Sequence, residues 1–223
     1  MIVAAVPVKD VINAKQRLMR ALDGPQRREL ARAMLTDVLR ALGGAGLDRV
    51  WVVTREPEVA AIAASLGAEP LAEPENRGHT AAVATAQAEA ARLGARAFLT
   101  IPGDVPCVTA AEIRALVEAL PRARAAVFAP SRSGLGTNGA LLAPPTAMRL
   151  RFGEPSFDNH LAAARALGLA PVVVRPRGLG LDVDAPEDLG ALLAEGAGTE
   201  SHALLARWRL PERPAGVRPA ALG

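Results

Sequence analysis

The chain has 223 residues, of which 50% are hydrophobic and 22% are charged, and its formal net charge is +3. These values predict one globular domain with a core of its own. The isoelectric point of 9.9 comes without any block of Lys or Arg, so we do not expect nucleic acid as a partner. Without an apolar run of about 18 residues or a signal-peptide pattern, we expect a cytoplasmic protein that does not contact a membrane.

Cysteine and histidine are rare and scattered. The single cysteine, Cys107, excludes an internal disulfide and any cysteine-based zinc cluster. The three histidines, His79, His160 and His202, are too far apart in sequence to form a metal motif. A nucleophilic role for Cys107 stays open, although the sequence shows no base beside it.

The first half of the chain alternates strand and helix patterns. An apolar, β-branched run predicts a strand at residues 2–8. Apolar residues at helical spacing predict a helix from Pro25 to Gly43. The same reasoning predicts strands at 50–54 and 68–72 and helices at 57–66 and from about 76 to 93.

Both lysines of the chain, Lys9 and Lys15, lie in the polar loop after the first predicted strand. An ammonium group binds phosphate as a compact point charge, in places where the planar guanidinium of arginine does not fit. We therefore interpret this loop as a phosphate-binding segment.

A second loop follows a short apolar strand at residues 97–101, which Pro102 and Gly103 end abruptly. Ligands of an open parallel sheet bind beyond the carboxyl ends of its strands, so Asp104 is expected at the mouth of a site. Its carboxylate suits Mg²⁺, which prefers oxygen ligands. The alternative is that Asp104 caps the helix beginning near Thr109, or shapes a turn.

The second half continues with strand patterns at 125–129, 140–143 and 171–174 and with helix patterns from Asp158 to Leu167 and from Pro186 onward, the last helix of the chain. Alternating strands and helices predict an α/β fold, a single-domain three-layer sandwich around a mainly parallel, Rossmann-like sheet. The residues from Pro211 are proline-rich and aperiodic, so we divide the chain into a domain at 1–210 and a flexible tail at 211–223.

A third loop, just before the last predicted helix, carries Asp182 and Asp184. Phosphates bound near the first strand need positive charge, and a metal that bridges them needs carboxylates from elsewhere in the sheet. Asp104 together with this Asp-x-Asp pair therefore predicts a metal site. Each has an alternative, because Asp184 is also suited to cap the helix and the acids after it to complement the helix dipole.

A small phosphorylated acid would need short donors and close backbone approach. Thr137 and Ser156 offer hydroxyl groups, and Gly153 leaves room for main-chain contact. The alternative is that these residues only stabilise turns.

Six motifs are spread over residues 1 to 195: Val6-Pro7-Val8-Lys9, Ala14-Lys15-Gln16-Arg17-Leu18, Gly103-Asp104-Val105-Pro106, Gly136-Thr137-Asn138, Phe152-Gly153-x-x-Ser156-Phe157-x-x-His160 and Asp182-x-Asp184-x-Pro186-Glu187-Asp188-Leu189. With them the chain resembles the glycosyltransferase-A-like (nucleotide-diphospho-sugar transferase-like) nucleotidyltransferases. Within that class it resembles the guanylyltransferases of deazaflavin coenzyme F-420 biosynthesis. It differs at Arg77-Gly78-His79-Thr80, where many members carry a Gly-Leu-Asn turn.

The resemblance implies that the phosphate of a three-carbon acid attacks the α-phosphorus of GTP and that pyrophosphate leaves. GTP and the phosphorylated acid are the implied partners, and Mg²⁺ is the implied cofactor. The implied roles are catalysis for Lys15, Arg17 and Asp104; nucleotide binding for Pro7, Lys9, Lys15, Arg17, Gly78, Thr80 and Gly103; acceptor binding for Thr137, Asn138, Gly153 and Ser156; and metal binding for Asp104, Asp184 and Asp182.

Other functions stay open at this point. Cytidylyltransferases and molybdenum-cofactor nucleotidyltransferases usually open with a glycine-rich loop, whereas residues 9–18 contain no glycine. A non-catalytic nucleotide-sensing module with the same fold is a further alternative. The sequence does not choose among phosphoenolpyruvate, 2-phospho-L-lactate and 3-phospho-D-glycerate as the acceptor, and it leaves open whether the chain forms a homodimer.

Overall fold

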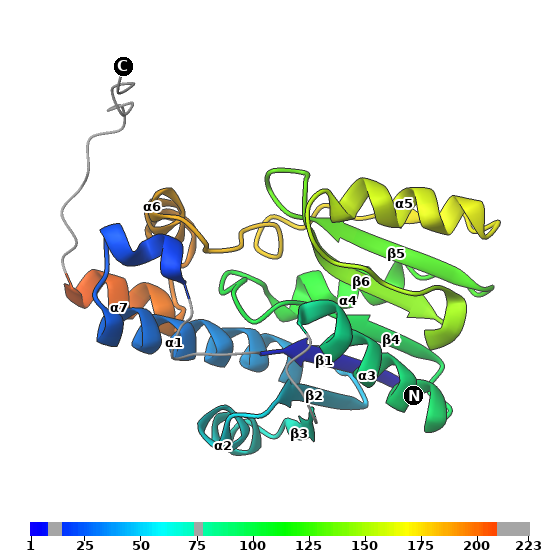
Figure 1. The fold of residues 1–223 in the computed structure, drawn as a ribbon, viewed down its shortest axis with the longest axis horizontal. Coiled ribbons are helices and arrows are strands. Elements are labelled where there is room, and N and C mark those ends of the chain that lie inside the picture. Colours follow the sequence, from blue (N-terminus) through cyan, green and yellow to red (C-terminus); the bar gives the residue numbers. More distant parts are fainter. Residues whose placement is uncertain (9–14, 74–77, 209–223) are drawn as a thin grey trace.

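A seven-stranded sheet with the order β3-β2-β1-β4-β6-β5-β7 runs through the computed structural model, which describes residues 1–8, 15–73 and 78–208 (Figure 1). The strands are β1 (Ile2–Pro7), β2 (Arg49–Thr54), β3 (Glu69–Ala72), β4 (Ala97–Thr100), β5 (Ala125–Pro130), β6 (Thr137–Ala143) and β7 (Val172–Val173). The helices are α1 (Gly24–Gly43), α2 (Pro57–Ser65), α3 (His79–Arg92), α4 (Ala110–Glu118), α5 (Ser156–Ala166), α6 (Pro186–Glu195) and α7 (Glu200–Trp208), with short 3-10 helices η1 (Gln16–Arg20) and η2 (Pro145–Ala147). The predicted α/β class is confirmed.

The sheet is mainly parallel, as expected, with one reversed strand. β1 pairs in parallel with β2 and β4, and β2 with β3, whereas β6 is antiparallel to both β4 and β5. Strands β4, β5 and β6 are buried along their whole length, and β4 and β5 accordingly read as short apolar runs. The reversal of β6 brings its first residues to the edge of the sheet where the parallel strands end.

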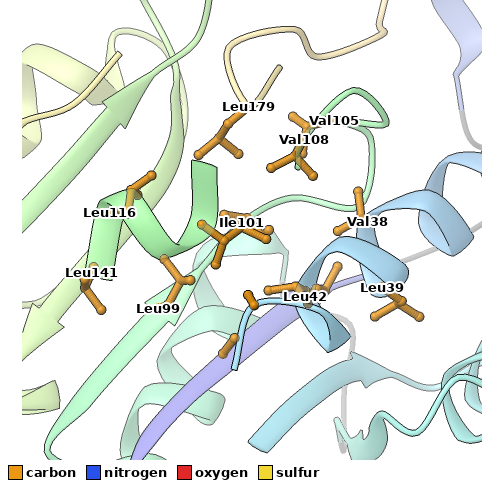
Figure 2. Packing of buried hydrophobic residues seen from close by; sticks show 14 of the residues in the cluster. Val38, Leu39, Leu42, Leu99, Ile101, Val105, Val108, Leu116, Leu141 and Leu179 are labelled. Atoms are coloured by element: carbon orange, nitrogen blue, oxygen red, sulfur yellow. The ribbon is translucent and has the colours of Figure 1, made fainter. Parts of the chain in front are cut away.

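Two hydrophobic clusters hold helices against the two faces of the sheet. On one face, α1, α2 and α4 pack through side chains such as Val38, Val59 and Leu116. On the other face, α3 and α5 pack through Val83 and Phe157, among others. These clusters give the three layers of the predicted sandwich, and Figure 2 shows part of the first one, between α1 and α4.

A third cluster lies where α1 extends beyond the sheet. Leu18 of η1 and Leu30 of α1 pack there against Leu192 of α6 and Leu205 of α7. Figure 1 shows η1, α6 and α7 gathered around this half of α1, to one side of the sheet. The expectation that the helix from Pro186 is the last one is therefore wrong, because α7 follows it.

One local expectation about helix ends needs correction, and two alternatives that treated the predicted metal ligands as helix caps do not hold. α5 begins at Ser156, so Asp158 lies in its first turn and does not cap it. Thr109 caps α4 by accepting from the N–H of Glu112, so Asp104 is not that cap. Before α6, the side chain of Asp188 accepts from the N–H groups of Asp184 and Ala185. Asp184 therefore keeps its own carboxylate free of capping.

None of the described helices is long and apolar enough to cross a membrane. The predicted tail at 211–223 and the predicted phosphate ligand Lys9 lie outside the described residues.

Candidate functional site

The loops that were predicted to carry the chemistry meet at one edge of the sheet. β1 and β4 are neighbours in the sheet. After β1 the chain adds β2 and β3 on one side of it, and from β4 onward it adds the remaining strands on the other side. Their carboxyl ends therefore flank a topological switch point, where open α/β sheets bind ligands. Pro7 ends β1 there and Asp104 follows β4, while the reversed β6 brings Thr137 and Asn138 to the same edge.

The loop that carries Asp104 is anchored in the core on both sides of that residue. Ile101, Val105 and Val108 are at most 5% exposed, and Figure 2 shows them within the cluster between α1 and α4. Each such buried side chain contributes about 1.5–3 kcal/mol. The N–H of Val183 also donates to the carbonyl of Asp104 over 3.0 Å, which joins this loop to the one with Asp182 and Asp184.

A pocket of about 450 Å³ opens at this edge. Its lining consists of Gly78, His79, Thr80, Pro102, Asp104, Gly136, Thr137, Asn138, Phe152, Gly153, Glu154, Ser156 and Asp182. All four predicted acceptor residues line it, together with two of the predicted metal ligands and two of the predicted nucleotide ligands. The structure thus brings residues from five separate segments of the chain to one hollow.

Lys15 stands between two of the carboxylates at the mouth of this pocket. Its Nζ donates to Asp104 Oδ2 and to Asp184 Oδ1, each over 2.6 Å, so the two acids necessarily face each other across a short gap. Burial alone would lower the pKa of Lys15, but the two carboxylates more than offset it and hold this pKa above its ordinary value. Lys15 was expected to face the phosphates of the nucleotide, and here its ammonium neutralises the acids.

Asp182 is held by a different partner. Asn138 Nδ2 donates to Asp182 Oδ1 over 3.1 Å and to the carbonyl of Leu179 over 3.0 Å. Burial raises the pKa of Asp182, the hydrogen bond from Asn138 opposes this, and the nearby charge of Asp104 raises it further. Asn138 therefore acts by holding Asp182 as well as by lining the pocket.

At the other end of the pocket lies a group of neutral donors. Thr137 and Ser156 are 6% and 2% exposed, and the N–H of Thr137 donates to Ser156 Oγ over 3.0 Å. His160 Nδ1 lies 2.9 Å from Thr137 Oγ1. Gly153 has φ +117°, and a Cβ built there would meet no atom within 4 Å. The open space at Gly153 therefore belongs to the pocket, and the hydroxyl groups border it.

The amino terminus of α3 and the loop with Gly153 are connected across the pocket. Gly78 has φ +100°, a conformation that favours glycine, and α3 begins directly after it. The hydroxyl of Thr80 accepts from the N–H of Phe152 over 3.0 Å. The rings of His79 and Phe152 meet edge to face with centroids 4.6 Å apart. The predicted nucleotide and acceptor segments therefore share one wall.

Some predicted residues lie outside the lining of this pocket. Pro7 and Gly103 are at the ends of the strands beneath it, where a Cβ on Gly103 would be 3.5 Å from Val6 and Leu35. Arg17 borders a second hollow of about 380 Å³, together with Gln16, Met19, Arg20, Pro186 and Glu187. Arg17 is thus outside the lining of the first pocket.

Sequence reasoning gave no role to several residues that the structure places at the site. His79 and Phe152 line the pocket, and His160 supports its hydroxyl groups from behind. Phe152 and His160 belong to a motif that had been recognised, so their position in it was an available signal. Cys107 is 9% exposed and burial raises its pKa to about 11, which argues against a nucleophilic thiolate.

The carboxylates fit a magnesium ion in their chemistry. Asp104 and Asp184 share the ammonium of Lys15, and their side chains remain 29% and 47% exposed. The charges of both acids also act on Asp182. Among the described residues no three His, Cys, Asp or Glu side chains converge on one point. Mg²⁺ is usually held by one or two carboxylates with substrate phosphates, which is the arrangement that these residues allow.

Comparisons with known proteins agree with this site. Residues 2–216 match the family model described as "Guanylyl transferase CofC like". The chain is 42% identical over 192 residues to a phosphoenolpyruvate guanylyltransferase of Conexibacter woesei, covering 85% of this chain and 86% of that protein. It is 37% identical to a 2-phospho-L-lactate guanylyltransferase of Methanothermobacter thermautotrophicus (95% and 92% covered) and 33% identical to a 3-phospho-D-glycerate guanylyltransferase of Phenylobacterium zucineum (92% and 98% covered).

Among solved structures, the fold is similar to that of a putative nucleotide-diphospho-sugar transferase from Desulfovibrio desulfuricans G20. The TM-score is 0.75 at 17% identity, and the match covers 92% of this chain and 94% of that one. At this identity the likeness shows the fold alone, whereas the family model spans nearly the whole chain. The chain therefore belongs to the CofC-like guanylyltransferases, a family of nucleotidyltransferases.

Proposed function

We propose that this family member transfers the guanylyl group of GTP to the phosphate of a three-carbon phosphorylated acid, releases pyrophosphate and serves coenzyme F-420 biosynthesis. The observation that carries the proposal is the pocket itself, which is lined both by carboxylates, of which Asp104 is bonded to Lys15, and by the neutral donors Thr137 and Ser156. Three relatives at 41–42% identity are named phosphoenolpyruvate guanylyltransferases, which makes phosphoenolpyruvate the first acceptor to test.

Both substrates are polyanions, so the site must supply counter-charge. Two unit charges 4 Å apart repel by about 4 kcal/mol at an effective dielectric constant near 20. Mg²⁺ on Asp104 and Asp184, with Asp182 beside them, would neutralise the phosphates and favour attack at the α-phosphorus. Lys15 would then turn its ammonium from the two carboxylates toward the phosphates, joined by Arg17 and Lys9 from the same loop.

The acceptor acid would occupy the end of the pocket formed by β6 and the amino terminus of α5. Thr137 and Ser156 offer hydroxyl groups there, and Gly153 offers a backbone without a side chain in the way. Asn138 would keep Asp182 turned toward the reacting phosphates. GTP would enter along Gly78 and Thr80 at the start of α3, with Pro7 and Gly103 forming the floor.

One assay tests this proposal. The purified protein is incubated with GTP, MgCl₂ and each of phosphoenolpyruvate, 2-phospho-L-lactate and 3-phospho-D-glycerate, and pyrophosphate release and product mass are measured. CTP in place of GTP is the control, because one protein with a similar fold is named a cytidylyltransferase. We expect a guanosine diphospho acid with GTP and little product with CTP. If none of the three acids supports pyrophosphate release, the proposal is refuted.

A further inference from the structure

His160 is the last residue of the Phe-Gly-x-x-Ser-Phe-x-x-His motif and does not line the pocket itself. The residue is 1% exposed. Its ring stacks on Phe128, with centroids 5.4 Å apart and 4° between the planes, and meets Phe152 edge to face at 5.1 Å. These two ring contacts fix the plane of the imidazole.

The two ring nitrogens of His160 have different partners. The backbone N–H of Arg151 donates to Nε2 over 3.0 Å, so Nε2 is an acceptor and carries no hydrogen. A neutral imidazole has one N–H, which is therefore on Nδ1. This Nδ1–H donates to Thr137 Oγ1, 2.9 Å away. The hydrogen-bond network thus selects a single tautomer.

The same network decides what the hydroxyl of Thr137 can do. Thr137 Oγ1 accepts from His160 and, over 3.3 Å, from Ser156 Oγ. A hydroxyl oxygen has two lone pairs and one hydrogen, so its acceptor capacity is filled by these two bonds. No other contact within the described part of the chain uses the hydroxyl hydrogen of Thr137. Because Thr137 lines the pocket, this hydrogen is left for a ligand there.

We propose that His160 is a positioning residue that makes Thr137 a one-way hydrogen-bond donor, and so selects an anionic group of the acceptor acid. The inference deepens the proposed function and rests on it. Carboxylate and phosphate oxygens at neutral pH only accept hydrogen bonds, so a hydroxyl with its lone pairs occupied matches them. His160 acts through Thr137 without touching the substrate.

Two amide substitutions separate the two nitrogens of His160. In His160→Asn the amide nitrogen lies near the position of Nδ1 and can still donate to Thr137. In His160→Gln the polar atoms lie near the position of Nε2, so the acceptor for Arg151 can be kept while the donor to Thr137 is lost. We expect kcat/KM for the acid to fall roughly tenfold in His160→Gln and less in His160→Asn, with the KM for GTP unchanged in both.

A double substitution tests whether the effect passes through Thr137. In the Thr137→Val background, His160→Gln should cause no further loss of acceptor kcat/KM, because the hydroxyl it orients is gone. Equal losses in the Asn and Gln variants, or an undiminished loss in the Thr137→Val background, would overturn the inference.

The tautomer of His160 can also be measured in the wild-type protein, so this test does not require any variant to fold. The chain has only three histidines, so ¹⁵N-edited NMR spectra can assign the tautomer of each. We expect the Nδ1–H tautomer for His160, and the Nε2–H tautomer would overturn the inference. An enzyme that is inactive with all three acids refutes the proposed function, whereas an active enzyme with the other tautomer refutes this inference alone.

Discussion

The stability of the protein should depend on the protonation of His160 in a way that can be calculated. Burial lowers the pKa of His160 to about 4, against an ordinary value of about 6.5. The unfolded chain therefore binds this proton more readily, so the stabilisation is complete above pH 6.5 and is lost as the pH falls toward 4. From these two values, lowering the pH from 7.5 to 5 should cost roughly 2 kcal/mol of unfolding free energy.

Urea unfolding followed by circular dichroism at pH 7.5, 6.5, 5.5 and 5 measures this effect, with His160→Asn as the matched control. Groups common to both proteins cancel in the difference between them. These include Asp182, whose raised pKa has the opposite effect and stabilises the fold as the pH falls. The advantage of the wild type over His160→Asn should shrink by about 2 kcal/mol between pH 7.5 and 5. A difference that does not change with pH would mean that His160 is not held neutral in the fold.

Three further predictions concern packing and the buried thiol. In Gly178→Ala the new Cβ would overlap the backbone carbonyl oxygen of Cys107 and lie 2.7 Å from its carbonyl carbon, so we expect a loss of at least about 1–3 kcal/mol in urea unfolding. Gly190→Ala, with no atom within 4 Å, should instead stabilise α6 by about 0.5–1 kcal/mol; equal effects of the two substitutions would contradict the steric argument. The carboxylate of Asp37 accepts three hydrogen bonds at the start of α7. Asp37→Asn should therefore lower the free energy of unfolding by about 1–3 kcal/mol and speed hydrogen exchange in α7, and unchanged exchange there would refute this. With a pKa of about 11, Cys107 should react with iodoacetamide at pH 8 at least tenfold more slowly in the native protein than in urea, and comparable rates would show that the thiol is accessible.

The sequence was most informative where local pattern and burial coincide. Strands such as β4 and β5 are buried on both faces, so short apolar runs bounded by turn residues indicate them. The loops after such strands follow directly, and Asp104 was placed correctly at the switch point. Thr137 and Ser156, chosen from the sequence as short hydroxyl donors within recognised motifs, both line the pocket, and their role toward an acceptor stays a prediction.

What could not be predicted depends on residues far apart in the chain. α7 has only nine residues, and its one local start signal is Thr199, whose Oγ1 accepts from the N–H of His202. Its other cap, Asp37, lies 163 positions before Glu200 and has no local signal. Lys15 meets acids that lie 89 and 169 positions away, and only the assembled sheet brings them together. The reversal of β6 likewise follows from the sheet and not from its own residues. Local patterns therefore predicted most of the helices and strands, whereas long-range contacts determine which side chains meet in the site.

The central claim is that the carboxylates facing each other across Lys15 promote guanylyl transfer in the pocket beside them. The most direct measurement is the rate of pyrophosphate release from GTP and phosphoenolpyruvate by the wild type and by Asp104→Asn. The matched control is Asp158→Asn, because Asp158 is exposed. Removing the charge of Asp104 at nearly constant shape should lower turnover by roughly 100-fold or more, and the control should retain wild-type turnover. An Asp104→Asn enzyme as active as the wild type would contradict the account.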